Sequence, residues 1–258
     1  MTLQRLLSVI RKAVQDYDMI QDGDKVALAV SGGKDSLAMA IAMKVLSRFY
    51  PHPFTVKAYT VSIGFENMDF SPIQKVMEEY EIPYEIINTQ IKEIVFDARK
   101  EDNPCALCAT LRKGALYTRI VEDGCQKVAL GHHTEDVVET FMLSLLYEGR
   151  LNTFQPVTYL TKTGLSVIRP MIYVPEKELI DFKNRMSLPA IKNTCPVDGI
   201  TKREEMKEML REWNQKDHLT TTRIFSAIAN SKLEGWGSPQ TLREPRTKKS
   251  EEKPNVLS

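Results

Sequence analysis

The sequence predicts an α/β fold with a doubly wound, mostly parallel sheet and a small C-terminal helical subdomain. Short apolar runs of β-prone residues alternate with segments whose apolar residues recur at helical spacing. A turn rich in glycine and small polar residues separates the first such strand from the helix after it. The chain has 258 residues, of which 42% are hydrophobic, so it can bury a substantial core in one domain or two small ones.

The first part of the chain alternates helices and strands. An amphipathic N-terminal helix is followed by a βαβαβ pattern, and then by a cysteine-bearing helix, a further strand and a further helix. Because successive parallel strands need crossover helices, we expect helices on both faces of the sheet. The predicted ranges are helix 3–17, strand 26–30, helix 37–49, strand 55–62, helix 71–80, strand 84–87, strand 127–130 and helix 134–147.

The pattern changes toward the C-terminus. From about residue 167 it becomes mainly helical, with helices predicted at 176–185, 202–213 and 221–232. We therefore expect residues 1–165 to form the sheet domain with its N-terminal helix, and residues 166–236 to form a helical extension. Residues 237–258 combine proline, serine and charged residues with few apolar ones, which is typical of a disordered tail.

Charge and hydropathy limit the classes of partner and compartment. The formal net charge is +1, so any contact with nucleic acid must come from a local basic patch. Arg99, Lys100, Lys113 and Arg119 cluster around the cysteine-bearing helix and are candidates for that patch, with a merely solvated surface as the alternative. No apolar stretch is long enough for a membrane span, and residues 1–20 are predicted to form an amphipathic helix rather than a signal peptide. These features predict a cytoplasmic protein that does not contact a membrane.

The turn Ser31-Gly32-Gly33-Lys34-Asp35-Ser36 follows the first predicted strand. Such a turn aims backbone N–H groups outward at the start of a helix, and glycines let a phosphate approach the backbone closely. Its spacing fits neither G-x-x-x-x-G-K-[ST] nor G-x-G-x-x-G. A simple helix cap would explain Asp35 and Ser36, but not the paired glycines together with Lys34.

A second polar tip, Gly131-His132-His133, follows the strand at 127–130. Because the carboxyl ends of parallel strands meet at one edge of the sheet, we expect this tip to share a site with the glycine-rich turn. Gly131 and His132 should line a nucleotide pocket, and His133 should cap or pack beside the next helix. Adjacent side chains at a strand end usually point apart, which argues against metal binding by the two histidines. Asp136, in the first turn of that helix, is the candidate carboxylate for magnesium or proton handling.

Four cysteines offer metal ligands or reactive thiols in a reducing compartment. Cys105 and Cys108 lie in the first turns of a predicted helix, and Arg112 shares their face. A lone C-x-x-C is compatible with half a zinc site, a redox pair or a cluster, and the sequence has no second C-x-x-C or nearby histidine pair to complete a zinc site. A third thiol is available at Cys195, whereas Cys125 is expected to be a buried small hydrophobe.

Several motifs together resemble a known family. The turn SGGKDS after an apolar strand resembles the pyrophosphate loop of the N-type ATP pyrophosphatases, which have the adenine nucleotide alpha hydrolase-like, or PP-loop, fold. The segments CALCATLRKGALY, GHHTEDVVETFMLSLLYEGRLNTFQP, VIRPM and TCPVDGITKREEMK resemble the tRNA 2-thiocytidine synthetase group, related to the tRNA 2-thiouridine synthetases. The resemblance spans roughly residues 22 to 215. It implies a 4Fe-4S cluster held by Cys105, Cys108 and Cys195, with an open iron that carries the sulfur.

Roles follow for the remaining candidates. The turn would bind the β and γ phosphates, Lys34 would neutralise the departing pyrophosphate, and Asp35 would bind Mg2+ or hold the loop. Arg112 would stabilise the adenylated intermediate. The residues expected to contact the nucleotide are Ala29, Val30, Ser31, Gly32, Gly33, Lys34, Asp35, Ser36, Thr60, Ser62, Gly131 and His132.

The sequence thus predicts an ATP-dependent, iron–sulfur tRNA sulfurtransferase. ATP would adenylate the C2 oxygen of a pyrimidine, sulfide would replace that oxygen, and AMP would leave. The expected cofactors are ATP, Mg2+ and the cluster, and the expected partners are tRNA, a sulfur donor protein or sulfide, and a second copy in a homodimer. The alternatives are thiolation of another RNA base or a small molecule, an amide-forming synthetase of the same superfamily, and a binding or metal-storage module that does not need Lys34 and Asp136.

Overall fold

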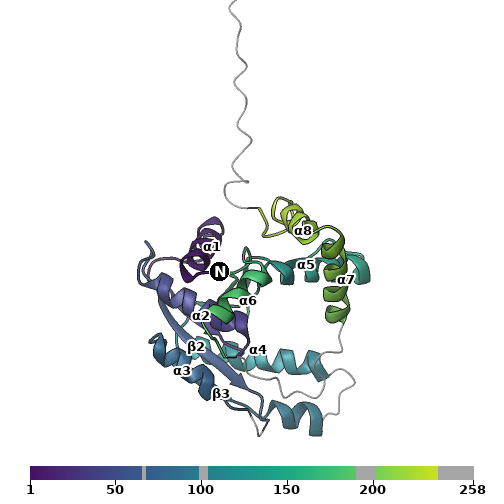
Figure 1. The fold of residues 1–258 in the computed structure, drawn as a ribbon. Helices are drawn as coiled ribbons and strands as arrows, with labels where there is room; N and C mark the ends of the chain where they lie inside the picture. Colours follow the sequence, from purple (N-terminus) through teal and green to yellow (C-terminus); the bar gives the residue numbers. More distant parts are fainter. Residues whose placement is uncertain (66–67, 99–103, 190–201, 238–258) are drawn as a thin grey trace, which may run out of the picture.

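The computed structural model describes residues 1–65, 68–98, 104–189 and 202–237 (Figure 1). A six-stranded sheet has the strand order β3-β2-β1-β4-β6-β5. Neighbouring strands pair in parallel except β5 and β6, which form an antiparallel hairpin at one edge. The strands are β1 (Lys25–Ala29), β2 (Thr55–Ser62), β3 (Tyr84–Asn88), β4 (Lys127–Ala129), β5 (Val157–Leu160) and β6 (Leu165–Ile168).

Helices cover both faces of this sheet, which confirms the predicted doubly wound, mostly parallel class. In β1, Val26 and Leu28 pack in one cluster with helices α1, α2 and α3, while Ala27 packs in another with α4. This alternation is the period of two expected for a strand buried on both sides. The helices are α1 (Leu3–Asp16), α2 (Lys34–Ser47), α3 (Ser71–Glu79), α4 (Pro104–Glu122), α5 (Thr134–Leu143), α6 (Glu176–Arg185), α7 (Lys202–Lys216) and α8 (Thr220–Ala229), with π-helical segments η1 (Glu93–Ala98) and η2 (Ser144–Glu148).

The C-terminal helices do not share one environment. Helix α6 packs against α2, whereas α7 and α8 pack against α5 (Figure 1). Val138 and Met142 of α5 form a small core with Met206 and Leu210 of α7. The proposed domain limit at 165/166 coincides with the start of β6, so the division of the chain into two domains stays a prediction. Within the described ranges, no helix is both long enough and apolar enough to cross a bilayer.

Two predicted helices differ from the structure, and one hairpin was missed. Helix α2 begins at Lys34 rather than at residue 37, because Gly33 already has the extended backbone of an N-cap residue. The helix predicted over 134–147 changes to π-helical hydrogen bonding at Ser144. The β5–β6 hairpin was not predicted, because its two strands have only four residues each.

Candidate active site

The glycine-rich turn is closed by its own hydroxyls. Ser36 Oγ donates to the carbonyl oxygen of Gly33 at 2.9 Å and accepts from the backbone N–H of Ser31 at 3.2 Å. Gly32 has a φ of +89°, in the region that favours glycine. Gly33 is the N-cap of α2 and has no side chain with which to cap it. The N–H groups at the start of α2 are therefore available to an anion, as the sequence predicted.

The second strand tip lies directly against this turn. A Cβ added to Gly131 would lie 3.1 Å from the backbone nitrogen of Ser36 and 3.2 Å from the carbonyl carbon of Asp35. Real Cβ contacts are rarely so short. Glycine at this position lets the end of β4 approach the start of α2, and the two predicted tips meet at one edge of the sheet.

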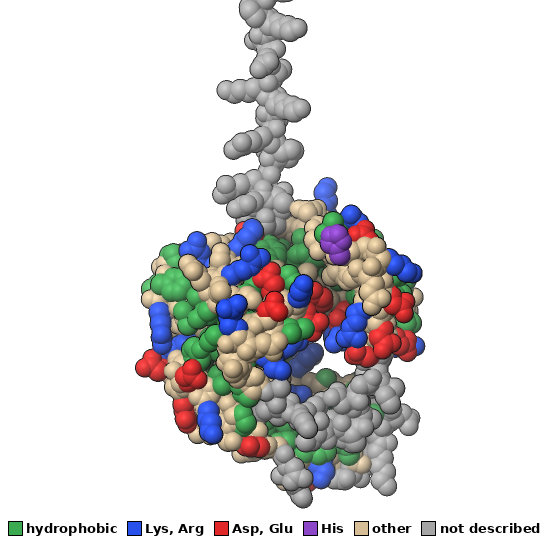
Figure 2. All heavy atoms as spheres, viewed as in Figure 1, with side chains coloured by type: hydrophobic (Ala, Val, Ile, Leu, Met, Phe, Trp, Pro, Cys, Tyr) green, Lys and Arg blue, Asp and Glu red, His purple; other side chains and the backbone are tan. Residues whose placement is uncertain are grey.

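A cleft of about 420 Å³ opens at this edge. Most of the candidate residues line it, and α4 contributes one wall of it. In Figure 2 the molecule is hollowed between the sheet domain and α7, with Lys and Arg side chains facing the hollow. The cleft brings together the predicted residues Ala29, Val30, Ser31, Gly33, Asp35, Ser36, Arg112, Gly131, His132 and Asp136.

Six lining residues were not predicted as nucleotide contacts. Three of them lie on α4 close to Arg112 in the sequence: Ala109, Lys113 and Leu116. The helical period around Arg112 could therefore have predicted that they line the same wall of the cleft. The remaining three come from strands β2 and β4 or directly follow them, and Tyr59 and Val61 point to the same side of β2. They are Tyr59, Val61 and Leu130.

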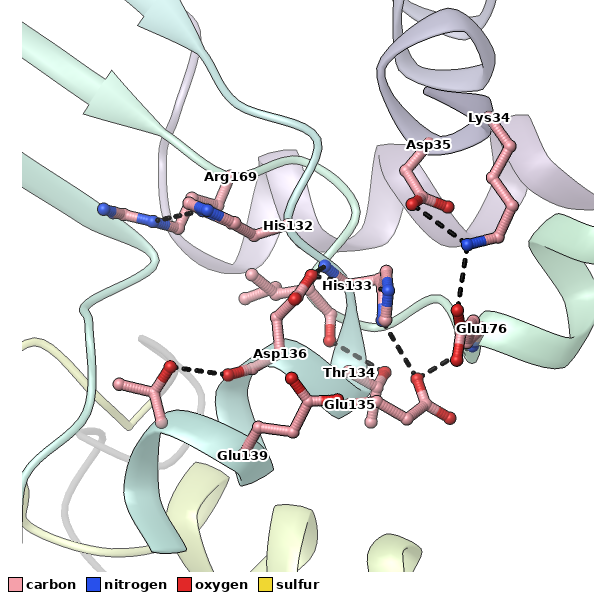
Figure 3. Close-up of polar contacts among 12 residues, drawn as sticks. Lys34, Asp35, His132, His133, Thr134, Glu135, Asp136, Glu139, Arg169 and Glu176 are labelled. Atoms are coloured by element: carbon pink, nitrogen blue, oxygen red, sulfur yellow. Dashed lines mark hydrogen bonds and ion pairs between the residues drawn. The ribbon is translucent and has the colours of Figure 1, made fainter. Parts of the chain in front are cut away.

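Four predicted contact residues do not line the cleft. Gly32 is buried within the turn. The hydroxyl of Thr60 is buried and donates to the carbonyl oxygen of Val30 at 2.7 Å, and Ser62 accepts from the hydroxyl of Thr89 through its carbonyl oxygen. Thr60 and Ser62 thus hold strand ends in place. The fourth, Lys34, points toward α6 (Figure 3).

Lys34 lies between two carboxylates. Its Nζ is 2.9 Å from Glu176 Oε1 and 3.2 Å from Asp35 Oδ2 (Figure 3). Burial disfavours the charged lysine, but the hydrogen bond that Lys34 donates to Glu176 and the charge of Asp35 outweigh it and raise the Lys34 pKa. Burial has the larger effect on Asp35 and raises its pKa, against the lowering effect of Lys34.

Asp35 also has an unused oxygen. Its Oδ1 is buried and has no hydrogen-bond partner within the described part of the chain. A buried carboxylate oxygen without a partner is costly, so the site is chemically suited to a further donor or a hard cation. The side chain of Asp35 therefore fits the Mg2+ that accompanies ATP.

His133 occupies the N-cap position of α5, as predicted. Its backbone N–H donates to Asp136 Oδ2 at 3.0 Å, and its Nδ1 lies 3.1 Å from Glu135 Oε2. Glu135 in turn accepts from the backbone N–H of Glu176 at 2.8 Å, which links α5 to the start of α6 (Figure 3). Burial opposes a charge on His133, but the hydrogen bond to Glu135 and the charge of Asp136 raise its pKa.

Cys105 and Cys108 lie in the first turns of α4, where Cys105 is exposed and Cys108 is half-buried. Cys195 lies outside the described residues. Within the described ranges, no three His, Cys, Asp or Glu side chains are grouped as a metal site. Cys125 is half-buried rather than fully buried as expected, and its Sγ lies 3.9 Å from the hydroxyl of Tyr59.

The four residues of the expected basic patch do not share one environment. Arg99 and Lys100 lie outside the described residues. Lys113 is exposed and lines the cleft, so it can meet a polyanion there. Arg119 is instead bound to Glu85 at 2.6 Å and to Asp123 at 2.7 Å, which makes it part of an ion-pair network.

Comparison with known proteins shows which family the chain is similar to. Residues 4–195 match the family model of the PP-loop domain. The chain is 34% identical over 229 residues to the tRNA-cytidine(32) 2-sulfurtransferase of Citrifermentans bemidjiense, covering 88% of this chain and 90% of the relative. It is 37% identical over 232 residues to the same-named protein of Alkalilimnicola ehrlichii, covering 89% and 74%. The chain belongs to the tRNA-cytidine(32) 2-sulfurtransferase family. This membership confirms the resemblance seen in the sequence motifs.

A solved structure also shares the fold of this family member. The U34-tRNA thiolase NcsA from Methanococcus maripaludis, solved with its [4Fe-4S] cluster, has a TM-score of 0.70 and 24% identity. The match covers 85% of this chain and 76% of that chain. At this identity the likeness concerns the fold alone, and it confirms the predicted PP-loop ATPase architecture.

Proposed function

We propose that this chain uses ATP to adenylate the C2 oxygen of a cytidine in tRNA, after which sulfur replaces that oxygen. Family membership supports tRNA thiolation, and the names of the relatives, which specify cytidine 32, support that position as the target. One structural observation carries the proposal. Helix α4 carries Cys105 and Cys108 in its first turns, and the same helix supplies Arg112 to the cleft beside the glycine-rich turn.

The first step is nucleotidyl transfer. The C2 oxygen attacks the α-phosphorus of ATP, the bond to the bridging oxygen of the β-phosphate breaks, and pyrophosphate leaves. The N–H groups of the turn bind the departing phosphates, because they point outward from the start of α2. Lys34 can neutralise the leaving group by exchanging one carboxylate partner for a phosphate oxygen.

Two further residues that line the cleft act on the acceptor base. Arg112 lines the cleft and places a guanidinium near the adenylated intermediate, where negative charge develops on the phosphate. Asp136 also lines the cleft and can hold magnesium or handle a proton. In the second step sulfur bonds to C2, the C2–O bond breaks, and AMP leaves.

An iron–sulfur cluster fits the thiols that the structure describes. Cys105 and Cys108 are one turn apart on α4 and accessible, which suits two ligands of a cluster, and Cys195 would be the third. When bound, such a cluster supplies an iron without a protein ligand that can carry the sulfur. The same proposal includes sulfide or a sulfur donor protein as the source of sulfur, a homodimer as the assembly and the cytoplasm as the location.

The decisive experiment is nucleoside mass spectrometry of tRNA from cells with and without the gene. We expect 2-thiocytidine to disappear when the gene is deleted and to return with the wild-type gene. Complementation with Asp136→Asn should fail to restore it, although the purified variant should still bind ATP. Unchanged 2-thiocytidine in the deletion strain would refute the proposal.

A further inference from the structure

Arg169 is a buried cation that directly follows β6. Arg169 is 8% exposed, and among the residues that the structure describes no carboxylate forms an ion pair with it. The guanidinium nitrogen Nη1 donates hydrogen bonds to the carbonyl oxygen of Gln155 at 2.5 Å and to the hydroxyl of Thr158 at 3.1 Å. The guanidinium carbon lies 4.8 Å from the centre of the Phe154 ring. These contacts satisfy hydrogen bonds, but they leave the positive charge without an anion.

The remaining contact of Arg169 is to His132. The guanidinium Nε–H donates to Nδ1 of His132 at 3.2 Å (Figure 3). Burial lowers the pKa of Arg169 to about 10, so the guanidinium is still protonated at neutral pH. An imidazole nitrogen that accepts a hydrogen bond carries no proton of its own. The ring proton of a neutral His132 must therefore be on Nε2.

The environment keeps His132 neutral. Burial, followed by the charge of Arg169, lowers the pKa of His132 to about 4. The ring also stacks on Phe154, with a distance of 4.7 Å between the ring centres. Its orientation is thus fixed by a hydrogen bond at one nitrogen and by a stacked ring.

The other nitrogen of His132 is available to a ligand. The ring lines the cleft, and within the described part of the chain Nε2 has no hydrogen-bond partner and is not among the fully buried polar atoms. Gly131, the residue before it, packs against the backbone of Ser36. His132 therefore lies close to the glycine-rich turn that binds phosphate.

We infer that Arg169 is a positioning residue that fixes His132 as the Nε2–H tautomer, so that His132 donates a hydrogen bond to a phosphate oxygen of the nucleotide in the cleft. A phosphate oxygen accepts this bond, and its negative charge also compensates the buried guanidinium behind the ring. The inference rests on the proposed function only for the identity of the ligand. The tautomer is a property of the chain itself.

The tautomer can be measured by NMR. Long-range 1H–15N correlation of the full-length protein labelled with 15N-histidine, at pH 7, separates protonated from unprotonated ring nitrogens. The chain has four histidines, and His132→Gln identifies the signals of His132. We expect a proton on Nε2 and none on Nδ1 in the wild type. Arg169→Met should remove this preference, whereas Arg169→Lys should keep part of it, because an ammonium can still donate. A proton on Nδ1 in the wild type, or an unchanged tautomer in folded Arg169→Met, would overturn the inference.

A second pair of variants leaves Arg169 in place, in case its removal prevents folding. The amide nitrogen of His132→Gln reaches the position of Nε2, whereas that of His132→Asn reaches only the position of Nδ1. Calorimetry with ATP and Mg2+ should show that His132→Asn loses about tenfold in affinity, the effect of one hydrogen bond to a charged group, and that His132→Gln keeps most of it. Arg48→Met is the control, because Arg48 pairs with Glu81 at the surface.

Failure of this inference can be distinguished from failure of the proposed function. Equal losses in His132→Gln and His132→Asn, or a wild-type protein that does not bind ATP, would overturn the assignment of Nε2 to the nucleotide. Unchanged tRNA thiolation in a deletion strain, with ATP binding and the tautomer as expected, would overturn the proposed tRNA activity alone.

Discussion

Lys34 and Glu176 form a 2.9 Å ion pair that links the glycine-rich turn to the first turn of α6. The same ammonium lies 3.2 Å from Asp35, so two carboxylates hold the lysine that we propose neutralises the departing pyrophosphate. A triphosphate in the cleft must share or displace one of them. On the proposed function, the start of α6 therefore contributes to the nucleotide site, although it is 142 positions from Lys34 in the sequence.

Lys34→Ala should abolish pyrophosphate release in the presence of tRNA and leave the fold intact. The change removes charge stabilisation of the leaving group, which costs roughly 3 kcal/mol of barrier, or about a hundredfold in rate. Lys34 contributes no core packing, so the unfolding temperature should change little. Lys44→Ala, on the same helix and away from the turn, is the matched control. Wild-type turnover by Lys34→Ala would refute the role of the lysine.

The sequence was sufficient to predict that the glycine-rich turn and the Gly131 segment meet at one edge of the sheet, because its signals are local. Val30 ends an apolar strand, Gly32 and Gly33 form the turn, and Gly131 follows another apolar strand. Parallel strands bring such tips together without any further information. The sequence misplaced the start of α2, because Gly33 begins the helix with its backbone alone and leaves Lys34 and Asp35 in its first turn.

The residues that orient these tips were not predicted, because they come from distant segments. Arg169, Glu176 and Arg203 contact His132, Lys34 and Asp136 across gaps of 37, 142 and 67 residues. Each is a charged side chain in a segment with an ordinary helical or short strand pattern. Nothing in local spacing distinguishes them from solvated surface charges, and only packing of α6, β6 and α7 against the site brings them there.

Gly131→Ala should weaken ATP binding more than it weakens the fold. A methyl group 3.1 Å from the nitrogen of Ser36 must push the turn away by a few tenths of an ångström, which disturbs the phosphate-binding N–H groups. We expect ATP affinity, measured by calorimetry, to fall by about tenfold if the disturbed turn loses the equivalent of one charge-assisted hydrogen bond.

Gly114→Ala provides the control for this change. Gly114 lies in α4, and an added Cβ there meets nothing within 4 Å. Alanine favours a helix interior over glycine by about 1 kcal/mol, so Gly114→Ala should be neutral or stabilising and should bind ATP normally. Equal ATP affinity in the Gly131 and Gly114 variants would contradict the close approach of β4 to the turn.

Arg203→Met should destabilise the packing of α7 on α5. Arg203 donates to Glu139 at 3.0 Å, and Glu139 is 3% exposed. Without this partner the buried carboxylate is unsatisfied, which costs about 2 kcal/mol of unfolding free energy. Glu139→Gln removes the charge, so adding it to Arg203→Met should recover part of the loss.

The loss should also depend on pH, with a sign set by Glu139. Burial raises the Glu139 pKa in the folded protein, and removal of Arg203 raises it further. A raised carboxyl pKa means that the folded state binds the proton more tightly than the unfolded state, so stability falls as pH rises through these values. Denaturant unfolding should therefore show a larger deficit for Arg203→Met at pH 8 than at pH 5. A pH-independent deficit would contradict the assignment to Glu139.

The cysteines provide a test of stoichiometry. Protein purified without oxygen should be brown and contain about four irons per chain if a 4Fe-4S cluster is present. Changing Cys105, Cys108 or Cys195 singly to alanine should remove the colour and stop sulfur transfer, because two protein ligands are too few to retain the cluster. Cys125→Ala is the control and should leave colour and activity unchanged, because Cys125 contacts Tyr59 within the strand core.

Two other outcomes would each identify a different centre. Copurified zinc, or a requirement for Cys125 equal to that for Cys195, would indicate a four-thiolate structural site. A colourless enzyme that depends only on Cys105 and Cys108 would indicate a dithiol that carries persulfide. The expected loss of iron from the Cys195 variant would show that this residue reaches the two thiols of α4. Because Arg112 of that helix lines the cleft, the sulfur would then be delivered beside the base that ATP activates.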